Sequence, residues 1–137
     1  MPCTHPLLVP VEPEDHGLAP PGREDPQHPE LARNLTKAIG GLRKGIPETM
    51  KGFSALAAAA TAEGALDTKT KELIATAIAV AVRCDGCIAF HVKAAVRGGA
   101  SREELLEMLG MAIYMGGGPS MVYAAQALEA YDQFAAG

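Results

Sequence analysis

The sequence contains no tryptophan and only six other aromatic side chains, three Tyr and three Phe, among its 137 residues. Strands favour aromatic and β-branched residues, whereas this chain has twenty-five alanines together with frequent Leu, Ile, Val and Met. The composition therefore disfavours an all-β domain and predicts an all-α fold of closely packed helices. The length and the 48% hydrophobic content suffice for one domain with a single core.

Basic clusters and long apolar runs are also lacking. The chain has 12 Lys+Arg against 16 Asp+Glu, and no basic stripe interleaved with aromatic residues that could collect phosphates. No segment is apolar for long enough to span a bilayer. The first apolar run, residues 7–9, has no basic residue before it and stops at Pro10, unlike a secretory signal. We therefore expect a cytoplasmic protein that binds neither nucleic acid nor membrane.

Proline is concentrated at one end of the chain. Eight of the ten prolines lie in residues 1–30, where six acidic side chains accompany a single basic one and no helical or strand period is present. We expect residues 1–29 to form an extended or disordered, proline-rich acidic arm, and residues 30–137 to form the helical domain. The irregular spacing of His5, His16 and His28 with Cys3 matches no metal-ligand pattern.

Apolar periodicity, interrupted by glycine and proline, divides residues 30–137 into six expected helices. The first begins at residue 30, with Pro29 suited to its first turn, and ends at Gly40 and Gly41. The others are expected at residues 47–63, at 68–83 with Asp67 as N-cap, from 84 or 85 to the Gly98-Gly99 pair, from a Ser101/Glu104 capping box to the glycines at 116–118, and at 120–134.

Two of these segments are unusually apolar. Residues 73–82 are apolar except for Thr76, so nearly every face of that helix is covered and we expect it to be central and buried. The last segment, residues 120–134, also has more apolar surface than a peripheral helix needs. It packs either into the core of its own chain or against another copy.

Cysteine is scarce, but two of the three cysteines are close together. Cys84 and Cys87 are separated by Asp85 and Gly86 at the expected start of a helix. Unpaired backbone N–H groups and the helix dipole stabilise a thiolate at such a position. In the cytoplasm, closely spaced cysteines are more often catalytic or metal-binding than structural.

Two further residues suit thiol chemistry. His91 lies one turn after Cys87 on the same helical face, where its imidazole could take the thiol proton directly or through a water. The carboxylate of Glu72, on the preceding helix, could orient that imidazole and accept the proton onward.

The same four residues allow a different reading. Cys84, Cys87, His91 and Glu72 could bind zinc as a tetrahedral set, in a non-enzymatic metal-binding or oligomeric protein. Structural zinc sites generally hold small domains that lack a core, whereas this chain has ample core, so zinc is the less favoured alternative. A thioredoxin fold is disfavoured because the βαβ context is missing.

Four segments together carry a more specific pattern. They are KTKELI at residues 69–74, CDGCIAFH at 84–91, GGASREE at 98–104 and MGGGP at 115–119. Over roughly residues 45–135 the chain thereby resembles the alkylhydroperoxidase D-like branch of the carboxymuconolactone decarboxylase family. The resemblance implies an all-α bundle of about six helices that assembles into homo-oligomers, commonly trimers or hexamers.

The resemblance also implies an activity, the thiol-dependent reduction of hydroperoxides by an antioxidant oxidoreductase. Cys87 would be the peroxidatic residue and Cys84 the resolving one, while His91 and Glu72, the latter as general base, would form a proton relay. No bound cofactor is implied, only a dithiol donor such as a lipoylated or thioredoxin-like protein.

One position departs from that family's pattern. The best-studied members have a histidine immediately before the second cysteine, and this chain has Gly86 there. A relay residue is therefore missing, which favours disulfide reduction as the alternative redox activity. Lactone decarboxylation, the activity of the other branch of the family, is a further alternative. The cysteine pair argues against it, because that reaction does not need two thiols.

Overall fold

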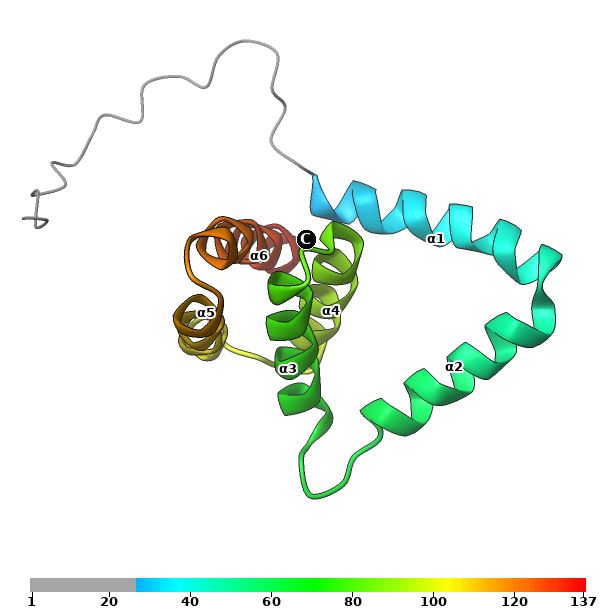
Figure 1. Ribbon diagram of the computed structural model, residues 1–137, viewed down its shortest axis with the longest axis horizontal. Helices are drawn as coiled ribbons and strands as arrows, with labels where there is room; N and C mark the ends of the chain where they lie inside the picture. The colour runs from blue at the N-terminus through cyan, green and yellow to red at the C-terminus, as the bar shows by residue number, and fades with distance from the viewer. Residues whose placement is uncertain (1–26) are drawn as a thin grey trace, which may run out of the picture.

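The computed structural model of the protein describes residues 27–137, and every regular element in this range is an α-helix (Figure 1). The prediction of an all-α fold with six helices is thus confirmed. The helices are α1 (His28–Gly45), α2 (Pro47–Thr61), α3 (Thr68–Ala81), α4 (Asp85–Arg97), α5 (Arg102–Gly116) and α6 (Gly118–Ala136). Within the described residues, no helix is both long and apolar enough to cross a membrane.

The core lies between α3, α4, α5 and α6, where α3 and α6 contact each other and each contacts both α4 and α5. Val80 of α3, Ile88 and Val92 of α4 and Leu105 of α5 are fully buried there. The α6 residues that face them include Ala124, Ala127 and Ala130, whose small side chains let the helices approach closely. α1 contacts α4 and α6 and then extends from the bundle, and α2 returns at an angle toward the start of α3 (Figure 1).

Two predicted helix caps are present. The Asp67 carboxylate accepts the Thr70 N–H over 2.7 Å at the start of α3. At the start of α5, the Ser101 hydroxyl accepts the Glu104 N–H, and the Glu104 carboxylate accepts the Ser101 N–H. These bonds satisfy backbone donors that the first helical turn leaves unpaired, so local sequence determines both starts.

The bounds of α1 differ from the sequence prediction at both ends. The helix begins at His28, so His28 and Pro29 belong to it and not to the arm expected at residues 1–29. It also continues through Gly40 and Gly41, because glycine in a helix interior costs only about 1 kcal/mol. α1 ends at Gly45 because Pro47 disfavours the helical conformation at Ile46. Residues 1–26 of the expected arm, including Cys3, His5 and His16, lie outside the described residues.

The prediction that residues 73–82 are buried on nearly every face is wrong for the single chain. α3 buries one side, which includes Glu72 and Thr76, whereas Ile74, Ile78 and Val82 on another side are exposed. An apolar run predicts that a surface is covered but does not say by which chain. α6 similarly packs its alanine stripe into the core and leaves Met121 and Val122 exposed.

His28 is buried where α1 meets α6 and α4. Among residues 27–137 neither ring nitrogen has a hydrogen-bond partner, and Nε2 lies 3.8 Å from a carboxylate oxygen of Glu129 on α6. Burial lowers the pKa of His28 below its usual value, although the negative charges of Glu129 and Asp85 partly oppose this effect. The neutral imidazole is therefore the form that suits the folded state.

We expect this histidine to make the fold sensitive to acid. Unfolded histidine titrates near pH 6.5, so its contribution to the free energy of unfolding is constant above that pH and decreases as the pH falls below it. Urea unfolding at pH 7.5 and pH 5.0 tests this with His28→Phe, which keeps an aromatic ring and cannot titrate. The wild type should lose more stability between the two pH values than the variant, and an equal loss would contradict the assignment.

Candidate functional site

The end of α3 determines where the first cysteine lies. The Cys84 N–H donates to the Ala79 carbonyl over 3.0 Å, and the Arg83 N–H donates to the Val80 carbonyl over 3.2 Å. These two bonds form a Schellman motif, in which the residue after the C-cap adopts a left-handed conformation. Arg83 has φ 59°, at a position where glycine is usual and where a side chain costs about 1 kcal/mol. α4 ends in the same motif with Gly99, at φ 84°.

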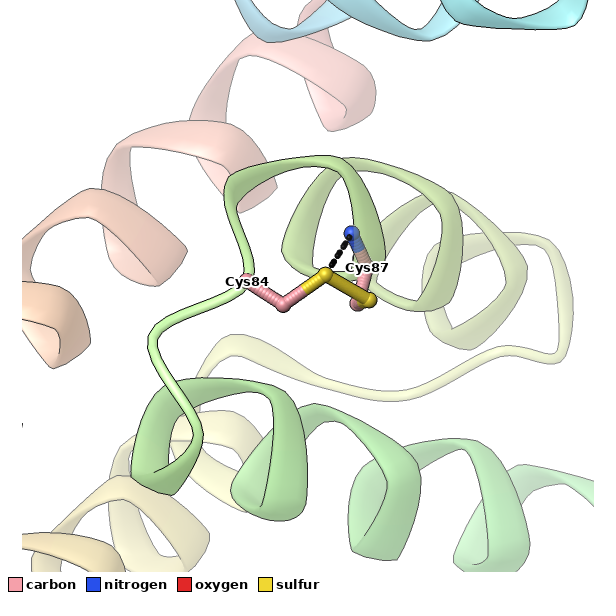
Figure 2. Close-up of a disulfide and its surroundings, with 2 residues drawn as sticks. All are labelled: Cys84 and Cys87. Carbon is pink, nitrogen blue, oxygen red and sulfur yellow. Dashed lines mark hydrogen bonds between the residues drawn. A yellow bond between two sulfur atoms is a disulfide. The ribbon is translucent and has the colours of Figure 1, made fainter.

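The two cysteines lie at the start of α4, as the spacing predicts. Cys84 is the N-cap residue, and its Sγ accepts the Cys87 N–H over 3.2 Å (Figure 2). The two residues form a disulfide, with their Cα atoms 5.2 Å apart. Both are partly buried. After reduction, the same N–H group and the helix dipole would stabilise negative charge on the Cys84 sulfur.

Glu72 and His91 form a direct pair between α3 and α4. His91 Nδ1 lies 2.7 Å from Glu72 Oε2, and the Glu72 residue is only 7% exposed. An ionised Glu72 accepts the Nδ1–H of the imidazole, which leaves the lone pair on Nε2. No described residue bonds Nε2, and the His91 side chain is 38% exposed. The pair can therefore exchange a proton at Nε2 with a neighbouring group or a solvent molecule.

The four expected residues form two bonded pairs, one at the start of α4 and one between α3 and α4. Glu72 contacts His91, Cys84 is bonded to Cys87, and Cys87 shares a face of α4 with His91 at a spacing of four residues. With Cys84 and Cys87 bonded to each other, the four side chains are not arranged as the ligands of a zinc ion. Within residues 27–137, no group of three or more His, Cys, Asp or Glu side chains is placed to hold a metal ion.

Leu35 of α1 is a site residue that the sequence did not indicate. A Cβ atom added at Gly86, the second residue of α4, would lie 2.6 Å from Leu35 Cδ1. The space next to the second cysteine is therefore filled by an apolar side chain, at the position where the related branch has a histidine. Leu31 and Leu35 are one helical turn apart, which predicts an apolar stripe on α1 but not what the stripe covers.

Comparisons with known proteins identify the family. A sequence model that describes the carboxymuconolactone decarboxylase family matches residues 47–130, more than half of the chain. The chain belongs to the carboxymuconolactone decarboxylase family. A crystal structure of an apo family member from Legionella pneumophila superposes with a TM-score of 0.79 at 56% identity, covering 81% of this chain and 99% of that one.

Other relatives match most of the same region of the chain. A Thermotoga maritima crystal structure has a TM-score of 0.65 at 34% identity, covering 77% of this chain and 90% of its own. An uncharacterised protein of Cupriavidus necator is 43% identical over 98 residues, 72% of this chain and 87% of the relative. An uncharacterised Haemophilus influenzae protein is 42% identical over 103 residues, 75% and 91% of the two chains. These relatives establish the family and the fold, and their names assign no reaction.

The contact between α1 and the cysteine segment of this family member is testable by a double-mutant cycle. Gly86→Ala should lower the free energy of unfolding by about 1 kcal/mol, because the new methyl group displaces Leu35. In a Leu35→Ala background the same change should be neutral or stabilising, since the obstacle is gone and alanine favours a helix. Urea unfolding of the four proteins measures the coupling, and additive effects would show that Leu35 does not constrain position 86.

Proposed function

We propose that this carboxymuconolactone decarboxylase family member is a thiol-dependent oxidoreductase that reduces hydroperoxides with electrons from a dithiol. The observation that carries the proposal is the Cys84–Cys87 pair at the N-terminus of α4, one turn before a histidine that is bonded to Glu72. Two neighbouring cysteine thiols supply two electrons when they become a disulfide, and a carboxylate–imidazole pair can accept the thiol proton.

The first step consumes the hydroperoxide. The Cys87 thiol loses its proton to His91 Nε2, and the thiolate attacks one peroxide oxygen. An S–O bond forms, the O–O bond breaks, and the leaving alkoxide takes a proton from the imidazolium. The products are an alcohol and the sulfenic acid of Cys87. Cys87 suits this role because it shares a face of α4 with His91, and the resemblance described above assigns it the same role.

The next steps return the enzyme to its starting state. The Cys84 sulfur attacks the Cys87 sulfur, an S–S bond forms, the S–O bond breaks, and hydroxide leaves as water with the Cys84 proton. An external dithiol then reduces Cys84–Cys87 by exchange and becomes a disulfide itself. The Cys87 N–H favours reduction because it stabilises a thiolate on Cys84. One hydroperoxide and one dithiol thus yield an alcohol, water and a disulfide.

The donor is proposed to be a dithiol protein, lipoylated or thioredoxin-like, and no bound cofactor takes part. The Leu35 contact at Gly86 also favours a related activity, disulfide reduction without peroxide. An apolar side chain occupies the space of a relay histidine there, so proton transfer to a leaving alkoxide depends on His91 alone. Thiol–disulfide exchange requires less assistance of this kind.

Replacing the cysteines one at a time tests the proposal. In metal-free full-length protein supplied with dihydrolipoamide and cumene hydroperoxide, Cys87→Ser should reduce turnover to the rate without enzyme. Cys84→Ser should also stop turnover, but Cys87 should still form one equivalent of sulfenic acid, which dimedone traps and mass spectrometry detects. Cys3→Ser is the matched control, because Cys3 is the one remaining cysteine in the sequence and lies far from the segment that contains Cys84 and Cys87.

The possible results separate the competing accounts. Turnover that persists in Cys87→Ser would exclude Cys87 as the attacking residue. Reduction of a small disulfide without peroxide consumption, lost in both variants, would indicate the disulfide reductase activity. About one bound zinc per chain, with unfolding by a chelator, would instead support the metal-binding alternative.

The Glu72–His91 pair should act as one unit in catalysis. We expect Glu72→Gln to lower kcat/KM about 10²-fold, because the amide stabilises the imidazolium less well than the carboxylate does. His91→Asn should cost at least as much, and the double variant should be no worse than His91→Asn alone. The pH profile of kcat/KM checks this assignment, since loss of the base removes its acid limb. Multiplied defects in the double variant, with an unchanged profile, would indicate separate structural roles.

A further inference from the structure

Arg83 is an exposed arginine with a left-handed backbone, directly before the disulfide residue Cys84. Its φ is 59°, and among residues 27–137 it is the one non-glycine residue with a positive φ. In this conformation a Cβ atom crowds the following carbonyl oxygen, which is why glycine is the usual residue there. Backbone outliers of this kind cluster at functional sites. The arginine side chain therefore requires an explanation beyond the geometry of the turn.

The end of α4 forms the same turn with different residues. Both helices end in a Schellman motif, but in α4 the left-handed residue is Gly99 and the cation of the helix end is Arg97, in the last turn. α3 has no basic residue in its last turn and has Arg83 at the glycine position. A cation that only stabilised the helix dipole could lie in the last turn, where the backbone is helical. The dipole therefore does not explain why arginine occupies position 83.

The guanidinium of Arg83 is available to a molecule that approaches the disulfide. Among the described residues, none holds it by a hydrogen bond or an ion pair, Asp85 included. Arg83 lies on the short connection through which the chain passes from α3 to Cys84 (Figure 2). Residues 73–97 carry three basic side chains against one acidic one, although the whole chain has a net charge of −4. The segment that contains the disulfide is thus cationic in an acidic protein, which favours an anionic ligand.

We propose that Arg83 binds an anionic group of the dithiol that reduces the Cys84–Cys87 disulfide, so that the electron donor is an acidic dithiol. The proposal rests on the proposed function and names the chemistry of its electron donor. Arginine suits this role because its planar guanidinium can donate two parallel hydrogen bonds to one carboxylate. Next to Cys84, it would hold the donor with its thiols at the disulfide before exchange begins. The carboxylate can belong to a small dithiol or to an acidic side chain beside the dithiol of a protein.

The exchange itself separates recognition of the donor from activation of the disulfide. A donor thiolate attacks Cys87 Sγ and forms an S–S bond, and the Cys84–Cys87 bond breaks with its electron pair on Cys84 Sγ, where the Cys87 N–H donates. The second donor thiolate attacks the donor sulfur bonded to Cys87, closes the donor disulfide and releases Cys87. The two donor protons end on the two cysteines. Positive charge from Arg83 assists the departure of Cys84 equally for every donor, whereas recognition depends on the charge of the donor.

Dihydrolipoate and dihydrolipoamide test the proposal, because they are the same dithiol with and without a carboxylate. Every full-length protein carries Cys3→Ser, so that alkylation followed by mass spectrometry counts only the thiols of Cys84 and Cys87. At pH 7.5 and about 0.1 M ionic strength, we expect dihydrolipoate to reduce the disulfide of this reference protein about two- to fivefold faster than dihydrolipoamide. At about 1 M the ratio of the two rates should approach one, because the Debye length falls from about 10 Å to about 3 Å.

Variants at position 83 assign the preference to one side chain. Arg83→Gln removes the charge but keeps a long side chain, so the rate ratio should fall to about one, whereas Arg83→Lys should keep most of the preference. The matched control is Arg97→Gln, which removes the same charge at the other end of α4 and should leave the ratio unchanged. Arg83→Gly should lose the preference and yet raise the melting temperature by about 2–5 °C, because glycine accommodates the left-handed backbone. A purely structural arginine would not give these opposite effects.

The inference is overturned by equal rates for the two dithiols, by a preference that survives Arg83→Gln, or by one that Arg97→Gln removes to the same extent. A lower melting temperature for Arg83→Gly would overturn it too, since Arg83 would then serve stability. These results leave the proposed function intact, whereas a disulfide that neither dithiol reduces would overturn both. Two dithiol peptides that differ only in Glu or Gln beside their cysteines identify the source of the carboxylate. A preference for the Glu peptide supports a protein donor, and a preference for dihydrolipoate alone supports a small one.

Discussion

Cys84 is hydrogen-bonded to two helices, because its N–H donates to the Ala79 carbonyl at the end of α3 and its sulfur accepts the Cys87 N–H at the start of α4. Only three residues separate the two helices, so the disulfide cannot move independently of either one. The left-handed Arg83 completes this connection at a conformational cost of about 1 kcal/mol. The helices repay that cost through the core they share, which includes Val80, Ile88 and Val92.

The same connection sets the position of the Glu72–His91 pair. Glu72 lies near the start of α3 and His91 in the middle of α4, so a bond of 2.7 Å between them requires the two helices to lie side by side. The chain reverses at Cys84, which brings Glu72 within reach of a histidine nineteen residues later. Burial of Glu72 protects this bond from competition by water. The positions of the disulfide and of the Glu72–His91 pair are thus consequences of one helix–helix connection.

α1 and α2 pack against the rest of the molecule in different ways. α1 packs on α4 and α6 through buried residues that include His28 and Ala32, and it places Leu35 over Gly86. α2 contributes no buried residue to its own chain and presents Phe53 and Leu56 to the outside. The described chain therefore has a closed core on one side of the helices and leaves a set of large apolar side chains exposed on the other.

Local sequence by itself determined the helical content and several helix starts. Asp67 and the Ser101/Glu104 box act within one turn, and the Cys84–Cys87–His91 spacing places three side chains on one helix whatever surrounds it. The motifs of the family could be recognised for the same reason, because each lies within one short segment of the chain. The predicted end of α1 at Gly40 and Gly41 was wrong, because a glycine pair weakens a helix without ending it. The left-handed backbone at Arg83 was not predicted, because glycine is the residue that normally indicates this conformation.

Only the tertiary structure decided which surfaces meet. The apolar run at residues 73–82 predicted burial, but the packing of α4, α5 and α6 left Ile74, Ile78 and Val82 uncovered. The contact of Leu35 with Gly86 joins residues fifty-one positions apart, and nothing in either local pattern indicates it. Hydrophobicity is non-directional, so a sequence specifies that a face must leave water, while the geometry of the packed helices decides which neighbour covers it.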